Sequence, residues 1–256
     1  MTINRRLFLA SAAASGAVTM LPYASYAAAH AGNVFKTPGG DITVHPLSHA
    51  SFVMQTPVGT IYSDPVGDPA QYASFAKPDL ILITHHHGDH YNADTLAAIT
   101  GDGTQIIANP EVYGKMPADL KAMTREISNG GEDSFGAMKL DAIPAHNLTA
   151  GREKFHPKGR DNGYVLSFDG FRVYISGDTE DIPEMRALRD IDLAFVCMNL
   201  PFTMDSAAAA DAVAEFKPTY VYPYHYRGKD GGTQDAADFA KAVGDAVNVK
   251  LANWYG

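Results

Sequence analysis

The segment that most constrains this chain is an apolar run that ends in a cluster of histidines. Residues Leu80–Thr84 read Leu-Ile-Leu-Ile-Thr and lead directly into His-His-His-Gly-Asp-His at His85–His90. Along an extended backbone alternate side chains share a face, so His85 and His87 point together while His86 points away. A protein core does not bury so many polar side chains unpaired. The segment therefore predicts a buried strand that delivers a ligand-binding loop to the end of a sheet.

The side chains of this loop are those that bind first-row transition metals. Gly88 permits a tight turn, which can bring Asp89 and His90 back toward the first histidines. Imidazole nitrogen and carboxylate oxygen are ligands that zinc prefers. One loop cannot complete two coordination spheres, so further ligands are expected at the ends of later strands. Three candidates directly follow strand-like runs: His146, Asp178 and His225.

Short apolar runs separated by turns continue along the rest of the chain. Runs at Ile42–Pro46, Ser51–Gln55 and Thr60–Ser63 are typical of an antiparallel meander. From Leu80 onward, expected strands alternate with helices. The strands are expected at 80–84, 105–108, 139–143, 164–168, 171–176, 193–196, 219–222 and 247–251, and the helices at 93–99, 118–123, 207–216 and 234–243. Residues 30–256 are therefore predicted to form a single α/β domain with two β-rich halves and helices outside.

The N-terminus has the three parts of a signal peptide in order. Arg5 and Arg6 precede an uncharged run over residues 11–21, and small residues then give A-x-A-like cleavage sites around Ala27 to Ala31. The run is too short to span a bilayer comfortably, so no stable membrane anchor is expected. The paired arginines resemble a twin-arginine signal, whereas an ordinary Sec signal needs only positive charge. Residues 1–29 are predicted to engage export machinery and to be cleaved, which places the mature protein in the periplasm.

The charge balance argues against nucleic acid as a partner. The chain has 20 basic and 29 acidic residues and a formal net charge of −9. An acidic surface offers little attraction to a phosphate backbone. A small-molecule substrate is expected instead.

The metal-binding residues resemble those of the metallo-β-lactamase fold superfamily, whose H-x-H-x-D-H signature is complete at His85–His90. The resemblance covers essentially the whole mature chain and implies an αββα four-layer sandwich with the metals at one edge of the two sheets. The ligand sets that it implies are His85, His87 and His146 for a first ion, Asp89, His90 and His225 for a second ion, and Asp178 as the carboxylate that bridges them.

Further stretches are similar to the L-ascorbate-6-phosphate lactonase-like branch of metal-dependent hydrolases. They are Ser48–Phe52, Tyr62–Pro65, Phe155–Gly159, Gly163–Tyr164, Ser176–Thr179 and Phe202–Met204. This resemblance implies a hydrolase that opens a cyclic ester or a related ester. The alternatives are a phosphodiesterase, a β-lactamase, a mononuclear iron redox enzyme such as a persulfide dioxygenase, and a metal carrier without enzymatic activity.

The expected chemistry needs no serine or cysteine nucleophile. Two divalent ions about 3.5–4 Å apart can hold a bridging hydroxide that is nucleophilic at neutral pH. Zinc is the first expectation for both ions, with manganese or iron as alternatives. Asp89 is expected to orient the attacking water and Asp178 to hold the ions at a fixed separation, so these two are the catalytic candidates.

Four further residues are candidates for roles around the ions. His49 and Asp64 are expected to lie next to the ligands, where Asp64 either orients a ligand histidine or is a simple turn residue. Tyr224 and Tyr226 flank His225, and each either offers a hydroxyl to an oxyanion or packs in the core.

The connection after His146 is too long and polar for a simple turn. It contains His156 and Lys158, which are candidates for contact with a ligand or with the substrate. Its other basic residues are Arg152, Lys154 and Arg160. A cationic edge on an acidic protein predicts a lid over an anionic substrate, with a solvated loop as the alternative.

Overall fold

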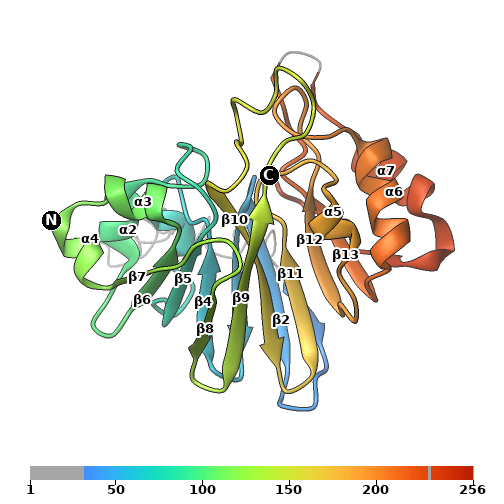
Figure 1. Cartoon of the computed structure of the whole chain (residues 1–256). Helices are drawn as coiled ribbons and strands as arrows, with labels where there is room; N and C mark the ends of the chain where they lie inside the picture. Colours follow the sequence, from blue (N-terminus) through green and yellow to red (C-terminus); the bar gives the residue numbers. More distant parts are fainter. Residues whose placement is uncertain (1–31, 230–231, 256) are drawn as a thin grey trace, which may run out of the picture.

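Two seven-stranded β-sheets pack face to face with helices on both outer faces (Figure 1). The computed structural model describes residues 32–229 and 232–255. This arrangement confirms the predicted αββα four-layer sandwich. The predicted signal peptide, residues 1–29, lies outside the described residues.

The first sheet has the strand order β1-β2-β3-β4-β5-β6-β7. Its strands are β1 (Asn33–Phe35), β2 (Ile42–Ser48), β3 (Ser51–Thr56), β4 (Gly59–Ser63), β5 (Leu80–Ile83), β6 (Gln105–Ala108) and β7 (Thr124–Glu126). The helical segments between them are the 3₁₀ helix η1 (Pro69–Tyr72) and the α-helices α2 (Ala93–Ile99), α3 (Pro110–Lys115) and α4 (Ala118–Ala122).

The second sheet has the order β14-β13-β12-β11-β10-β9-β8. Its strands are β8 (Glu132–Phe135), β9 (Met138–Ala145), β10 (Asp161–Phe168), β11 (Phe171–Ile175), β12 (Leu193–Cys197), β13 (Tyr220–Tyr224) and β14 (Asn248–Val249). Its helical segments are α5 (Pro183–Arg186), α6 (Ser206–Phe216), α7 (Ala236–Val243) and the 3₁₀ helix η2 (Gly244–Ala246).

The two sheets repeat one layout. In each sheet the first four strands pair antiparallel and the remaining pairs are parallel. The carboxyl ends of parallel strands meet at one edge of a sheet, which is where ligands bind in open α/β sheets. The loops that follow β5, β11 and β13 are therefore placed to build a common site.

The core between the sheets is aromatic and continuous. Phe52 of β3 stacks on Phe195 of β12 with ring centroids 4.0 Å apart. Trp254 is fully buried and packs edge-on against both of these rings. Because one buried cluster includes side chains from both sheets, the described residues form one packed unit. A second cluster lies beneath α2, α3 and α4.

The main helices begin at residues whose side chains cap them. Asn92 starts α2, Asn109 starts α3, Asp205 starts α6 and Asp235 starts α7, and each side-chain oxygen accepts a hydrogen bond from a backbone N–H of the first turn. Across the ranges that the structure describes, no helix combines the length and the apolar character needed to cross a bilayer.

Candidate metal centre

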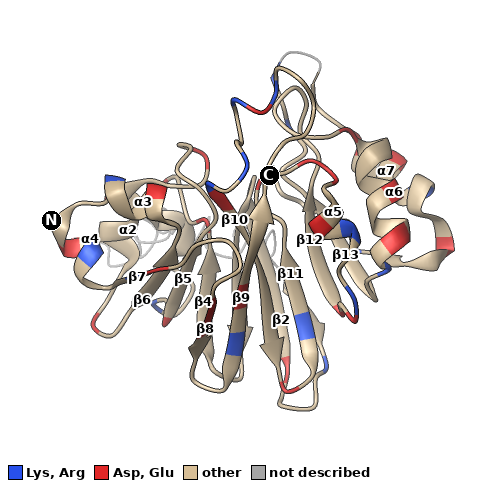
Figure 2. Ribbon diagram, in the orientation of Figure 1, with Lys and Arg blue, Asp and Glu red and all other residues tan. Residues whose placement is uncertain are grey.

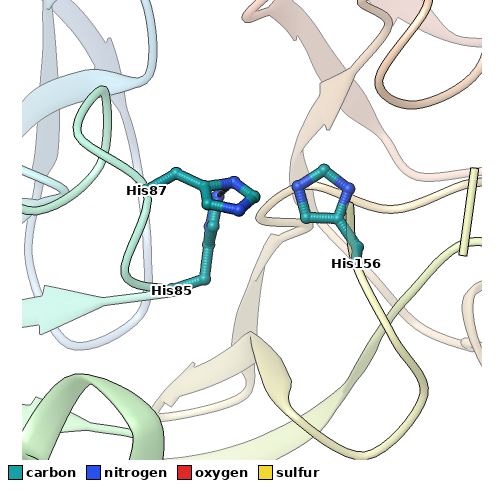
Figure 3. Close-up of side chains that lie close together, drawn as sticks. All are labelled: His85, His87 and His156. Carbon is teal, nitrogen blue, oxygen red and sulfur yellow. Dashed lines mark hydrogen bonds between the residues drawn. The ribbon is translucent and has the colours of Figure 1, made fainter. Parts of the chain in front are cut away.

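Three histidines from two loops converge at the edge of the sandwich (Figure 3). His85 and His87 lie on the loop after β5, and His156 faces them from the connection between β9 and β10. Nε2 of His85 lies 3.0 Å from Nδ1 of His87. One ring nitrogen from each of the three lies within 4.8 Å of the others. The alternation of side chains predicted for His85 and His87 is confirmed by this geometry.

His146 is not part of this group, which corrects the predicted ligand set. Its backbone is fixed against the segment after β11: its N–H donates to Oγ1 of Thr179 (3.1 Å) and its carbonyl accepts from the N–H of Glu180 (3.0 Å). The ring is buried and its charged neighbours are Glu184, Lys158 and Glu180 rather than the ligand carboxylates. The position of His146 directly after a strand therefore did not identify it correctly as a member of the first ligand set.

The connection between β9 and β10 folds back to bring His156 into the place expected for His146. The N–H of Asn147 donates to the carbonyl of His156 over 2.9 Å, which closes the loop. This connection contains two histidines, His146 and His156, and His146 was predicted as the ligand because it directly follows a strand. The one feature of the sequence that could have indicated His156 is the unusual length of this polar loop, because the loop must fold back to place His156 at the site.

Two further groups of ligand atoms complete the centre. His85, His90 and Asp178 form one group, and His49, Asp89 and His225 form the other. Nε2 of His225 lies 3.3 Å from Oδ2 of Asp89. His90, Asp89, Asp178 and His225 were all predicted as ligands, and the structure brings them together.

Asp178 lies between His156 on one side and His90 and His225 on the other. Its Oδ2 is 3.4 Å from Nε2 of His156. Its Oδ1 is 3.4 Å from Nε2 of His90 and 3.5 Å from Nε2 of His225. The two oxygens of one carboxylate thus face histidines of different sets, as a carboxylate shared by two ions requires.

The donor atoms fit divalent metal ions. Nε2 of His90, both ring nitrogens of His156, Oδ1 of Asp178 and Nε2 of His225 are buried without a hydrogen-bond partner among the described residues. Buried polar atoms are normally satisfied, and metal ligation would satisfy these atoms. Both ring nitrogens of His146 are also unsatisfied, so the grouping of the atoms, rather than the lack of partners alone, points to a metal site. The sets His85, His87, His156 and Asp89, His90, His225, with Asp178 between them, are the chemistry that zinc and related ions select.

Burial controls the protonation of the first ligand set. It lowers the pKa of His87 and of His156 to about 4, and it holds the pKa of His85 well below its usual value. These rings are therefore neutral at physiological pH and offer lone pairs for ligation.

Charged neighbours shift the pKa values of the second ligand set. Burial disfavours the charged form of His90, but the carboxylates of Asp178 and Asp64 outweigh it and raise its pKa. Burial likewise opposes ionisation of Asp89, yet the neighbouring imidazoles of His225 and His49 outweigh it and lower its pKa. Asp89 is therefore a carboxylate at every physiological pH.

Asp64 contacts His90 and holds its ring in place, which is the first of the two roles predicted for Asp64. It is fully buried, its Oδ2 lies 2.8 Å from Nδ1 of His90, and it accepts hydrogen bonds from the backbone N–H and the hydroxyl of Thr84, both at 2.7 Å. Fixing the proton on Nδ1 leaves Nε2 of His90 free for a metal.

His49 supports the second set. Its Nε2 lies 3.2 Å from Oδ2 of Asp89, and its ring lies over that of His225 with centroids 3.8 Å apart. His49, Asp64 and His225 all have positive φ angles, between 42° and 55°. Non-glycine residues adopt this conformation rarely and at an energetic cost, so the local backbone is specialised to aim these side chains.

Asn199 is a site residue that sequence reasoning missed. Nδ2 of its side-chain amide lies 2.7 Å from Nδ1 of His225, and its Oδ1 accepts a hydrogen bond from Oγ1 of Thr203 over 3.1 Å. Ligation through Nε2 leaves the proton of His225 on Nδ1, and a 180° turn of the Asn199 amide would present its oxygen to that proton. No sequence motif pointed to this residue.

The remaining predicted residues lie outside the ligand groups. The hydroxyl of Tyr224 is buried in the core and burial raises its pKa, whereas the ring of Tyr226 packs edge-on against Tyr255 with centroids 4.9 Å apart. Lys158 is largely exposed and its Nζ lies 3.8 Å from Oε1 of Glu184. Tyr224 and Tyr226 therefore pack against other side chains, which is the second of the two roles predicted for them.

A cavity of about 310 Å³ opens beside the ligands. Four ligand residues line it, His87, Asp89, His156 and Asp178, together with Phe155, Asn199, Phe202 and Lys229. Part of the predicted lid, the segment with Phe155, thus forms a wall of the site.

Comparison with known proteins identifies the family of this chain. Residues 43–225 match the family model described as the β-lactamase superfamily domain. The chain belongs to the β-lactamase superfamily. Within it, a UPF0173 metal-dependent hydrolase of Thermococcus onnurineus is 34% identical over 222 residues, which cover 81% of this chain and 95% of the relative. This superfamily member is thus a metal-dependent hydrolase of the metallo-β-lactamase fold.

Solved structures of similar proteins show the same superfamily fold. The crystal structure of a protein described as a metal-dependent hydrolase from Parabacteroides distasonis is 41% identical, with a TM-score of 0.78 over 87% of this chain and 98% of that one. Igni18, a metallo hydrolase from Ignicoccus hospitalis, is 22% identical, with a TM-score of 0.68 over 82% of this chain and 94% of that one. The second likeness concerns the fold alone.

Proposed function

We propose that this hydrolase binds two divalent ions and opens cyclic esters in the manner of a lactonase. The observation that carries the proposal is the position of Asp178, whose two carboxylate oxygens face separate sets of histidines. A site for a single ion has no need of a second set and of a carboxylate between the two.

Each part of the site has a task in this proposal. Two divalent ions would supply Lewis acidity and an activated water at neutral pH. His85, His87 and His156 would hold one ion, and Asp89, His90 and His225 would hold the other. Asp64 and Asn199 fix the ring orientation of a ligand histidine through its second nitrogen.

The metal and the bond cleaved are open to direct test. Zinc suits the mixed nitrogen and oxygen donors best, with manganese and iron as alternatives. Elemental analysis of natively purified protein should give two ions per chain. The same sample should hydrolyse lactones faster than bis(nitrophenyl) phosphate or β-lactams, and a chelated sample should hydrolyse none of them. Preference for either of the other substrates would replace the lactonase proposal with that activity.

We also propose that the chain is exported to the periplasm. The support lies in the sequence of residues 1–29, where Arg5 and Arg6 precede an uncharged segment and small-residue cleavage sites. A folded, metal-loaded protein suits the twin-arginine route suggested by the arginine pair.

A further inference from the structure

We infer that the cavity beside the metal centre binds a small ester that carries a carboxylate or phosphate group, and that Lys229 is the residue that binds this anion. The inference rests on the proposed function, because it names the substrate class of the same site. A volume of about 310 Å³ lies at the small end of ligand pockets, so the substrate is compact.

Phe155 and Phe202 form an apolar wall of the cavity, and contacts within the protein hold this wall in place. The rings of Phe155 and Phe202 meet edge to face, with centroids 5.1 Å apart at an interplanar angle of 82°. The loops that carry them are tied together: Nδ2 of Asn147 donates to the carbonyl of Phe202 over 2.7 Å, and Nη1 of Arg152 donates to the carbonyl of Thr203 over 3.0 Å. This wall suits a flat, apolar part of a substrate.

Figure 2 shows Lys and Arg along the loop between β9 and β10. Three of its basic residues, Arg152, Lys158 and Arg160, pair with carboxylates of the protein. Arg152 pairs with Glu180, and Arg160 forms a two-point ion pair with Asp161, with both N–O distances at 2.7 Å. Lys158 lies beside Glu184. None of these basic residues lines the cavity. The anion site expected from this loop is therefore not supplied by its own cations.

Lys229 is the basic residue that lines the cavity. Its ammonium lies 5.8 Å from the centre of the Phe202 ring. Among the ion pairs of residues 32–229 and 232–255, none includes Lys229. A cation, an aromatic pair and the metal ligands around one cavity fit a substrate that carries both an anionic group and the scissile ester.

Charge in the cavity depends on the ions. Asp89 and Asp178 also line it, and without metal their two carboxylates repel an anion. Bound divalent ions invert that balance. The anion is therefore expected to bind to the metal-loaded protein.

Phthalide and carboxyphthalide, the same aromatic lactone with a carboxylate on its benzene ring, form a matched pair of substrates. The metal-loaded wild type should prefer carboxyphthalide in kcat/KM. Lys229→Gln should weaken that preference about fivefold, mainly through the KM for carboxyphthalide, since an exposed ion pair of this kind contributes modestly. Lys229→Arg should restore the preference.

Lys154→Gln is the matched control, because Lys154 is also exposed and lies over a ring of the same pair, 5.1 Å from the centre of Phe155, but does not line the cavity. It should leave both substrates unchanged. An equal effect of Lys229→Gln and Lys154→Gln, or of Lys229→Gln on both lactones, would overturn the anion site while the hydrolase proposal stands.

Binding of benzoate and of benzamide, measured by calorimetry on the metal-loaded protein, separates the two proposals. If neither lactone is hydrolysed but Lys229→Gln weakens benzoate and spares benzamide, the lactonase proposal fails and the anion site stands. If Lys229→Gln leaves benzoate affinity unchanged, the anion site is wrong.

Discussion

Nε2 of His156 lies 3.4 Å from Oδ2 of Asp178, whereas the charged neighbours of His146, at the start of the same connection, are Glu184, Lys158 and Glu180. A loop rather than a strand end therefore delivers the third histidine of the first ligand set. The difference between these two histidines gives the most direct test of the proposed centre.

His156→Ala should remove one ion and abolish hydrolysis. A set of three histidines would be reduced to two, and the metal affinity should fall by at least about 100-fold, the upper end of what loss of an orienting partner alone costs. Elemental analysis after dialysis measures the result. His146→Ala is the control, and it should keep both ions; loss of metal from this variant alone would restore His146 as the ligand.

Asp178→Ala should lower the occupancy of both ion positions, because one carboxylate faces both sets. His225→Ala, by contrast, should leave about one ion per chain, held by His85, His87 and His156. Metal titration followed by calorimetry distinguishes the two variants. Two tight ions in Asp178→Ala, or full activity of a wild type with one ion, would favour a mononuclear centre.

Asn199→Leu should weaken the second ion about 10- to 100-fold and spare the first, because Nδ1 of His225 then loses its partner. Asn199→Asp presents an oxygen in either orientation and should retain the ion. Competition with a chromogenic chelator gives both affinities. The idea that Asn199 fixes the proton on Nδ1 fails if the Asp and Leu variants lose the ion equally.

Replacement of Arg5 and Arg6 by lysines should block periplasmic delivery through the twin-arginine route, since that receptor reads the arginine pair as an address. Cell fractionation and immunoblotting measure the distribution. A Sec signal tolerates lysine in this region, so normal delivery would assign the chain to the Sec route, with no bearing on the metal centre.

The elements that hydrophobic periodicity could predict are those with a buried face. The strands around Leu80–Ile83 and Phe171–Ile175 are almost entirely buried and were expected within a residue or two of their observed ends. The strands β7 and β8 were missed, because Thr124–Glu126 and Glu132–Phe135 are short, polar and largely open to solvent. Without an apolar face they give no periodic signal.

Ligands on tight loops after strands could be found from residue type and spacing, as for His85, His87 and Asp178. His156 could not be assigned that way, because its position depends on how the whole connection from Asn147 returns. Asn199 depends on a contact across separate loops, and a single asparagine gives no chemical pattern in the sequence.

The ligands come from both halves of the molecule: the loop after β5 belongs to the first sheet, whereas His156, Asp178 and His225 belong to the second. An ion bound by ligands from both halves would cross-link two halves that repeat one strand layout. Metal binding would then contribute to the free energy of docking the sheets. Because the two sheets also share one buried core, chelation should lower the free energy of unfolding of the whole sandwich rather than separate its halves.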